Sequence, residues 1–151
     1  MEPHVRVARI YAIPMRPAGI VRTWRSTPLS RSADQPGGAS FLCVIKDCGD
    51  QGRGTLSFPM RGISIALDIP IRDDTQALVD VLNEHVLGEG GRIYLAKDSF
   101  TRANHFQAME GRLGKWLQVR DKWDPQRRMR SRQSVRILGD PSGETSRREG
   151  A

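Results

Sequence analysis

One stretch, Gly91-Arg92-Ile93-Tyr94-Leu95-Ala96-Lys97-Asp98-Ser99, organises the rest of the chain. It follows a Gly-Gly break and predicts a short buried strand over residues 92–95, ended by a turn with one cation and one anion. Charges at the end of a buried strand are costly unless they are paired or used, so we expect this turn to deliver Lys97 into a site made mostly by other parts of a larger protein. On the local pattern alone, the favoured interpretation is a surface turn whose Lys97 and Asp98 face water.

The clearest strand signal lies between Arg61 and Ile71. Apolar side chains alternate there with small or polar ones, and a period of two predicts a strand with one face in the core. The other face could line a cavity or meet solvent. Upstream, the apolar run from Ala39 to Lys46 predicts a second strand, in which Cys43 is a small core residue. The core-facing positions of the first strand are Ile63, Ile65, Leu67 and Ile69, and its other face carries Ser64, Ala66 and Asp68.

Two helical segments complete the predicted fold. The first begins at a capping aspartate at position 73 or 74, repeats apolar residues at helical spacing and ends at Gly88. The second is capped by Thr101, places His105 on its apolar side as a packed and satisfied residue, and continues to Trp123. The order strand, strand, helix, strand predicts an α+β fold, with an antiparallel or mixed sheet covered by helices on one face.

The two ends of the chain differ from the middle in composition. The apolar fraction is 38%, and the shortfall is concentrated at the ends, which are rich in Arg, Pro, Ser and Gly. We therefore expect residues 1–38 to be a poorly ordered leader, although residues 5–13 could form a short strand, and residues 128–151 to be a basic, largely disordered tail. The net charge of +7 arises in these flanks. Because aromatic residues are not interleaved with these charges, the basic flanks are only a weak indication of nucleic-acid binding, and no specific nucleic-acid binding is expected.

The sequence contains no pattern for metal binding, export or membrane insertion. Cys43, Cys48 and the three histidines do not have the spacing of metal ligands, so no metal is predicted. No apolar segment has the length of a signal-peptide core or of a transmembrane helix. We expect a cytoplasmic protein, with peripheral attachment to the inner face of the membrane as a variant of that prediction.

Several blocks of sequence together resemble a known enzyme family. In their order and spacing they look like the C-terminal part of FAD-linked oxidases of the vanillyl-alcohol-oxidase type. The closest branch is that of the decaprenylphosphoryl-β-D-ribose 2-oxidases, and the D-arabinono-1,4-lactone oxidases are related. The blocks are Ser40–Lys46, Leu56–Pro59, Ile65–Ile71, Gly90–Ser99 and Val119–Pro125.

The resemblance implies a two-part enzyme. In the family, an N-terminal domain binds most of the FAD, and an α+β cap domain covers the flavin and holds the substrate. Residues 39–127 resemble the C-terminal part of that cap domain, whereas residues 1–38 do not resemble the family. The resemblance thus implies a fragment, or one half of a split enzyme whose FAD-binding chain is separate. Its implied activity is oxidation of a sugar hydroxyl by hydride transfer to flavin. The alternatives are a D-arabinono-1,4-lactone oxidase-like enzyme and, from another class, a non-catalytic basic binding module.

The resemblance also assigns roles to individual residues. It implies that Lys97 lies beside flavin and substrate, that Lys46 is a second catalytic lysine in the substrate pocket, and that Tyr94 contacts FAD. The expected ligands are FAD and a sugar or prenylphospho-sugar. Two positions depart from the family, because Ala66 replaces a cysteine and Cys48 replaces an aromatic residue, so the exact substrate stays open. The residues expected in the substrate pocket are Ser64, Ala66 and Cys48.

Overall fold

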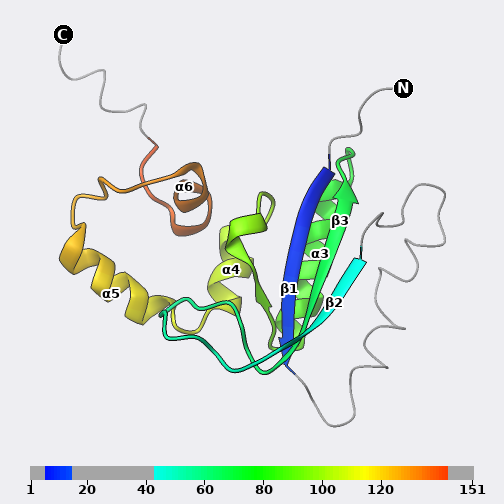
Figure 1. The fold of residues 1–151 in the computed structure, drawn as a ribbon. Helices are drawn as coiled ribbons and strands as arrows, with labels where there is room; N and C mark the ends of the chain where they lie inside the picture. Colours follow the sequence, from blue (N-terminus) through cyan, green and yellow to red (C-terminus); the bar gives the residue numbers. More distant parts are fainter. Residues whose placement is uncertain (1–5, 15–42, 143–151) are drawn as a thin grey trace.

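A four-stranded antiparallel sheet organises the computed structural model, which describes residues 6–14 and 43–142. The strand order is β2-β3-β1-β4, so that β1 and β3 are the inner strands. Each neighbouring pair is antiparallel (Figure 1). The strands are β1 (Arg6–Pro14), β2 (Cys43–Cys48), β3 (Gly62–Pro70) and β4 (Arg92–Ile93).

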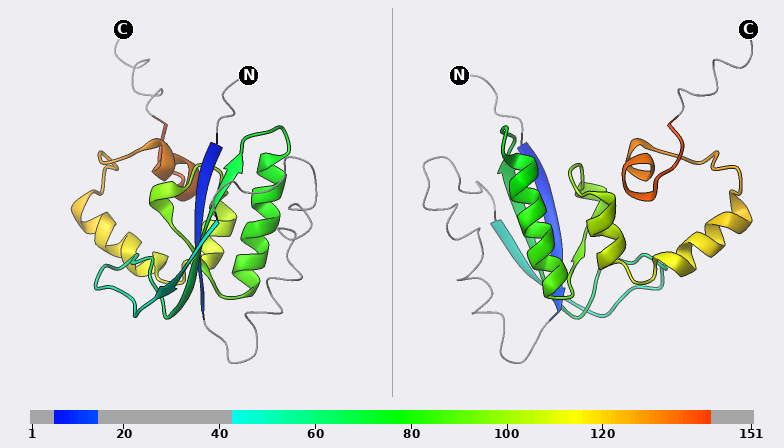
Figure 2. Two further views of the ribbon diagram at one scale, coloured as in Figure 1. Left: turned by 45° about the vertical axis from the view of Figure 1, so that its right-hand side comes forward. Right: turned by 180° about the vertical axis from the view of Figure 1, so that it is seen from behind.

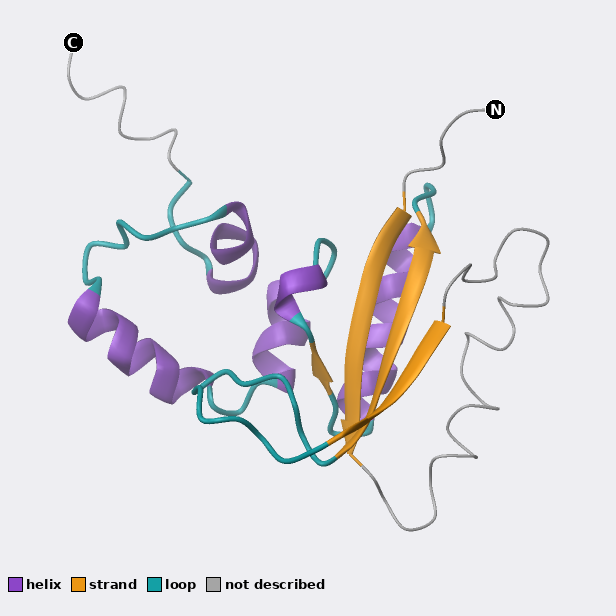
Figure 3. Cartoon of the chain, in the orientation of Figure 1, coloured by secondary structure: helices purple, strands orange, loops and turns teal. Residues whose placement is uncertain are grey.

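The helices lie on one face of the sheet and beyond its β4 edge. The longest helix, α3, runs along β1 and β3, and α4 lies between the sheet and α6 (Figures 1 and 2). Helices α5 and α6 extend away from the sheet, joined by a long loop (Figure 3). The α+β class predicted from the order of elements is therefore confirmed. The helical elements are α3 (Thr75–Gly88), η1 (Leu95–Lys97), α4 (Ala103–Met109), α5 (Leu113–Trp123) and α6 (Arg132–Leu138).

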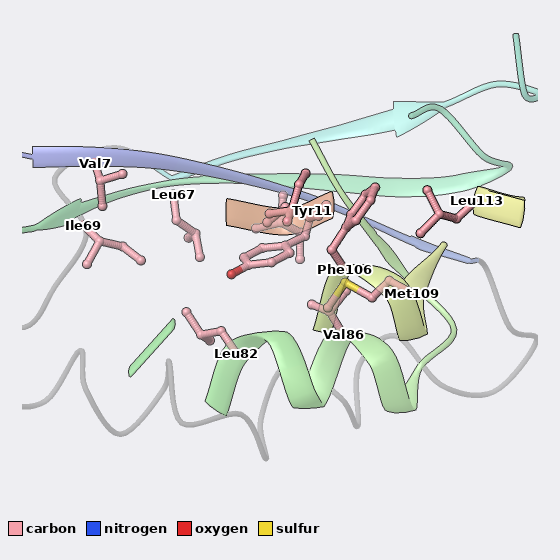
Figure 4. Close-up of a cluster of buried hydrophobic side chains, with 12 residues drawn as sticks. Val7, Tyr11, Leu67, Ile69, Leu82, Val86, Phe106, Met109 and Leu113 are labelled. Atoms are coloured by element: carbon pink, nitrogen blue, oxygen red, sulfur yellow. The ribbon is translucent and has the colours of Figure 1, made fainter. Parts of the chain in front are cut away.

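The core fills the space between the sheet and the helices. The predicted alternation in β3 is confirmed, because Ile65, Leu67 and Ile69 are buried against α3 whereas Ile63 is half-buried. Strand β1 adds a parallel row of inward-facing side chains (Figure 4). Burying a side chain of this size stabilises the fold by about 1.5–3 kcal/mol. The other core members include Val7, Tyr11, Leu82, Val86, Phe106 and Met109.

The predicted helices are present, but their ends differ in detail. Asp74 is at the N-cap of α3 without a side-chain capping bond. The hydroxyl of Thr75 instead accepts the Arg72 N–H at 2.7 Å, which ties the first turn to the preceding loop. The expected continuous helix from Thr101 to Trp123 is two helices, α4 and α5, because a turn at residues 110–112 separates them.

Three expectations about order and burial are wrong. Residues 6–14 do not belong to a loose leader, because they form β1 at the centre of the sheet. Residues 132–138 of the expected disordered tail form α6, which buries Ile137 in the core. Cys43 is exposed rather than buried, because it lies on β2, the edge strand of the sheet. The predictions for residues 15–42 and 143–151 lie outside the described residues.

A buried polar cluster joins the sheet to the helices. Its centre is Arg9, which is 0% exposed and forms an ion pair with Asp98, also buried. The Arg9 guanidinium further donates to Asn83 Oδ1 at 3.0 Å and to Thr101 Oγ1 at 2.8 Å. Arg136 on α6 donates to the second Asp98 oxygen at 2.8 Å. The cluster thus connects β1, α3, α6 and the turn after η1.

The pKa of Asp98 lies below its ordinary value. Burial alone would raise it, but the charge of Arg9 and hydrogen bonds from Arg136 and Thr101 together outweigh burial. A carboxyl group with a lowered folded pKa stabilises the fold above its unfolded pKa of about 3.9. That contribution is lost as the pH falls through the folded pKa.

We predict that Asp98→Asn lowers the free energy of unfolding by about 3–5 kcal/mol at neutral pH, because it leaves Arg9 buried without a counter-charge. The variant should also lose less stability than the parent as the pH falls below about 4, since its amide does not titrate there. Urea unfolding at several pH values measures both effects. Asp50→Asn is the control, because its partner Arg61 is exposed and such pairs contribute about 0–1 kcal/mol. Equal losses in the two variants would contradict the prediction.

Gly91 allows α3 to turn back into β4. A Cβ atom at this position would lie 2.6 Å from the Ala12 carbonyl oxygen and 2.8 Å from Val86 Cγ1. We predict that Gly91→Ala destabilises the fold by about 1–3 kcal/mol through overpacking. Gly114→Ala is the matched control, because nothing lies within 4 Å of its Cβ and alanine favours a helix by about 1 kcal/mol. Thermal unfolding of both variants tests this, and an unchanged melting temperature for Gly91→Ala would refute it.

Candidate functional site

A pocket of about 290 Å³ lies on the face of the sheet opposite α3. Its floor is made by side chains of β1, β2 and β3, and Tyr94 and Phe58 form one wall. The small side chains on this face of β3 leave the space that the pocket occupies. The lining residues are Ile10, Val44, Lys46, Phe58, Ser64, Ala66 and Tyr94.

The antiparallel register explains why these residues meet. Lys46 on β2 is paired with Ser64 on β3, and directly paired residues place their side chains on the same face. Two positions along, Ala66 is paired with Val44 on one side and with Ile10 on the other. The backbone of Tyr94 donates to the Ile10 carbonyl at 2.9 Å, which continues the β1–β4 pairing and brings the ring to the pocket.

The loop between β2 and β3 closes one side of the pocket. The Phe58 ring lies against the Tyr94 ring, with 5.0 Å between centroids and an angle of 52° between planes. Arg92 donates to Gln51 Oε1 at 3.1 Å and to the Ser57 carbonyl at 3.3 Å. Arg112 donates to the same carbonyl at 3.0 Å. Two guanidinium groups therefore hold this loop in place.

Four of the six predicted site residues line this pocket, and two do not. Lys46, Ser64, Ala66 and Tyr94 are brought together. Cys48 is half-buried at the end of β2, paired with Gly62, and is outside the lining. The sixth residue, the lysine on η1, is exposed and also outside the lining.

The turn that follows β4 separates its two charges. Lys97 is exposed, as the local pattern favours, but Asp98 is buried and paired with Arg9 and Arg136. The interpretation in which both residues face water is therefore wrong for Asp98. Gln133 on α6 adds a hydrogen bond to the Leu95 carbonyl at 2.6 Å, so the backbone on both sides of Lys97 is held.

Sequence reasoning did not identify several residues of the site. Ile10 belongs to a segment interpreted as a leader, and its partners are more than fifty residues away in sequence. Phe58 and Arg112 reach the site through a loop and a helix start, which have no periodic signal. The alternation of Val7, Arg9 and Tyr11 was the available signal for β1.

A second, larger hollow lies between α4, α5 and α6, with a volume of about 700 Å³. We call it the α5–α6 groove. Its wall includes Trp123 and Met129, which are 77% and 81% exposed, and Val119, which is half exposed. At one side, Arg120 forms a paired hydrogen bond with Asp140 at 2.6 and 2.8 Å. That bond, more than any other contact, lowers the pKa of Asp140.

The first pocket offers one cation, an aromatic wall, and a mainly apolar floor that carries a single hydroxyl, that of Ser64. Such a site suits a hydroxylated or planar ligand that carries or develops negative charge. Across residues 6–14 and 43–142, no three His, Cys, Asp or Glu side chains are grouped so that they could hold a metal ion. No helix within these ranges combines the length and the apolar character needed to cross a bilayer.

Comparison with known proteins supports a relationship to one enzyme branch. The chain is 42% identical over 86 residues to decaprenylphosphoryl-β-D-ribose oxidase of Mycolicibacterium smegmatis. The aligned residues make up 57% of this chain and 19% of that protein. It is 38% identical over 96 residues to an uncharacterized protein from the mprA 5′ region of Streptomyces coelicolor. This alignment makes up 63% of this chain and 26% of that protein. No family model matches the chain. The chain is thus related to the oxidase but corresponds to only a small part of its length.

Proposed function

We propose that this chain is part of a flavin-linked oxidoreductase that oxidises a CH–OH group of a sugar or prenylphospho-sugar, as a decaprenylphosphoryl-ribose 2-oxidase-like enzyme. In this proposal, residues 39–127 belong to the substrate-holding cap domain of a vanillyl-alcohol-oxidase-type enzyme. The observation that carries the proposal is the assembly of Lys46, Ser64, Ala66 and Tyr94, from three separate parts of the chain, around one pocket. A D-arabinono-1,4-lactone oxidase-like activity is the alternative within the same class.

The pocket suits one wall of a flavin site rather than a complete one. Its volume of about 290 Å³ is at the lower limit for drug-sized ligands, and FAD is larger than those. Tyr94 and Phe58 offer an aromatic wall, and Lys46 offers a cation beside it. These residues fit a planar ring and a hydroxylated sugar. We therefore assign FAD contact to Tyr94, and substrate contact to Ser64 and Ala66. For Lys97 and Cys48, which lie outside the lining, the proposed FAD and substrate contacts rest on the family resemblance alone.

The residues of this chain contribute positioning and electrostatics to the proposed reaction. A bound flavin supplies the acceptor for the hydride that leaves the carbinol carbon of the sugar. Lys46 and Lys97 stabilise the negative charge that develops beside them during this transfer. The buried pairing of Asp98 fixes the backbone from which Lys97 extends, so the lysine starts from a defined position.

The remainder of the active site requires further polypeptide. The chain corresponds to 19% of the length of the related oxidase. We propose that a separate FAD-binding polypeptide packs on the α5–α6 groove, because large exposed apolar surfaces such as that of Trp123 and Met129 mark interaction sites. We further propose a cytoplasmic enzyme, with peripheral attachment to the inner face of the membrane.

A non-catalytic basic binding module is the alternative from another class. Arg127 and Arg136 of the basic C-terminal cluster form ion pairs with aspartates, whereas Arg128, Arg130 and Arg132 are exposed. Cations that are already neutralised add little to polyanion binding, so only part of the cluster is available to such a module. Nucleic-acid binding that weakens steeply with salt would favour it instead.

We predict that the isolated chain binds FAD weakly, with a dissociation constant well above the low micromolar range. The reason is that its pocket can contact only part of the dinucleotide. Titration of FAD with the purified chain, followed by flavin fluorescence, measures this affinity. Stoichiometric binding at low micromolar concentration would show that the chain holds the cofactor without further polypeptide.

We predict that Lys97→Met and Lys46→Met slow flavin reduction by substrate about 10²-fold or more, while changing the free energy of unfolding by less than about 0.5 kcal/mol. Both lysines are exposed, so neither supports the core. The measurement is single-turnover reduction in the complete enzyme, formed by joining this chain to an FAD-binding polypeptide, alongside thermal unfolding. Lys115→Met on α5 is the control, because Lys115 is exposed and is not among the residues that line the pocket. A normal rate in Lys97→Met would make that lysine a solvated turn residue.

A further inference from the structure

The positive charge behind the loop that carries Phe58 is not fully compensated. Arg92 and Arg112 both donate to the carbonyl of Ser57, so their guanidinium groups are neighbours. Among residues 6–14 and 43–142, Glu110 is the one carboxylate that engages this pair, through Arg112 Nε at 2.6 Å and through Arg112 Nη2. Two cations thus share one anion in a partly buried place.

One nitrogen of this pair has no partner in the described part of the chain. Arg112 Nη1 is buried and makes no hydrogen bond there. Buried guanidinium donors are almost always satisfied, since an unsatisfied one keeps its desolvation cost without compensation. Burial, and next the neighbouring Arg112, lower the pKa of Arg92, whereas Glu110 raises it. Both observations indicate a place where a further negative group would be stabilised.

The cation pair borders the candidate pocket. Lys46, Ser64, Ala12 and Arg92 are successive partners across the four strands, so they form one row on the pocket face. The middle of the row is small, and each end is a cation. Arg92 is two residues from Tyr94, and so faces the same side of the sheet as that pocket residue.

We propose that Arg92 and Arg112 form a binding site for a phosphoryl oxyanion at the β4 side of the pocket. The forked geometry of guanidinium groups matches phosphate oxygens, and charge-assisted bonds of this kind are the strong ones. The site opens when the loop between β2 and β3 moves, so that the Ser57 carbonyl leaves the two guanidinium groups. Residues 49–54 of this loop are all exposed. The phosphate then accepts a hydrogen bond from Arg112 Nη1 and replaces the Ser57 carbonyl as the acceptor for Arg92.

Two sources could present this group to the site. One is the phosphate of a prenylphospho-sugar, with its sugar over Ser64 and Ala66, and the other is the pyrophosphate of a flavin dinucleotide. The choice between them rests on the proposed function, whereas the oxyanion site itself is tested without flavin.

The first experiment titrates the 151-residue chain with inorganic phosphate, followed by calorimetry and by NMR of the arginine Nε–H signals. We expect the signals of Arg92 and Arg112 to shift, and Arg112→Gln to weaken phosphate binding about tenfold or more. Arg102→Gln is the matched control for charge, because Arg102 pairs with Asp80 on the helix side of the sheet and is exposed. It should change the affinity by less than about twofold. Arg112→Lys keeps the charge without the fork and should fall between the two.

The inference is overturned if phosphate shifts neither arginine signal in the parent chain, a result that does not depend on how a variant folds. It is also overturned if Arg102→Gln weakens binding as much as Arg112→Gln, because binding would then follow net charge alone. Competition by farnesyl phosphate or by ADP identifies the source: stronger competition by the first supports a prenylphospho-substrate, and by the second a dinucleotide. Phosphate binding without flavin reduction in the complete enzyme would refute the proposed function and leave this site intact.

Discussion

The buried ion pair between Arg9 and Asp98 is the interaction on which the rest of the structure depends. Both side chains are removed from water, and each would destabilise the fold if its partner were absent. Their hydrogen bonds reach Asn83 on α3 and Arg136 on α6, so elements far apart in sequence must be in place together. The pair therefore specifies one arrangement of sheet and helices, which apolar burial alone would define less sharply.

The same pair helps to determine which side chains face the core and which face the pocket. Arg9 points toward the helices with Val7 and Tyr11, so the alternate residues of β1 point to the opposite face. That face includes Ile10, which lines the pocket. Asp98 likewise points inward from its turn and leaves Lys97 exposed. The pairing of one buried carboxylate thus sets the direction of residues on both sides of the molecule.

The sequence predicts the elements whose side-chain period is clear and misses those in which a charge interrupts it. β3 alternates without exception on its core face, and α3 repeats at helical spacing, so both were predicted within a few residues. β1 has the same alternation, but Arg9 occupies a core position. From the sequence alone an arginine is expected to face solvent, because nothing local shows that Asp98 will pair with it. Likewise, the resemblance supplied Lys46 and Tyr94, whereas Ile10 and Phe58 depend on long-range pairing and loop closure. No local pattern encodes either of these.

The pocket exists because the two faces of the sheet carry side chains of different size. On the helix face, large side chains fill the space between layers, as close packing requires. On the pocket face, Ser64 and Ala66 of the inner strand β3 cover the backbone but leave the volume above them free. A larger side chain at Ser64 or Ala66 would fill this volume from the floor. Lys46 and Arg92 then place positive charge at the two outer strands. A floor of small residues between two cations leaves room for a ligand above the sheet and favours negative charge at its ends.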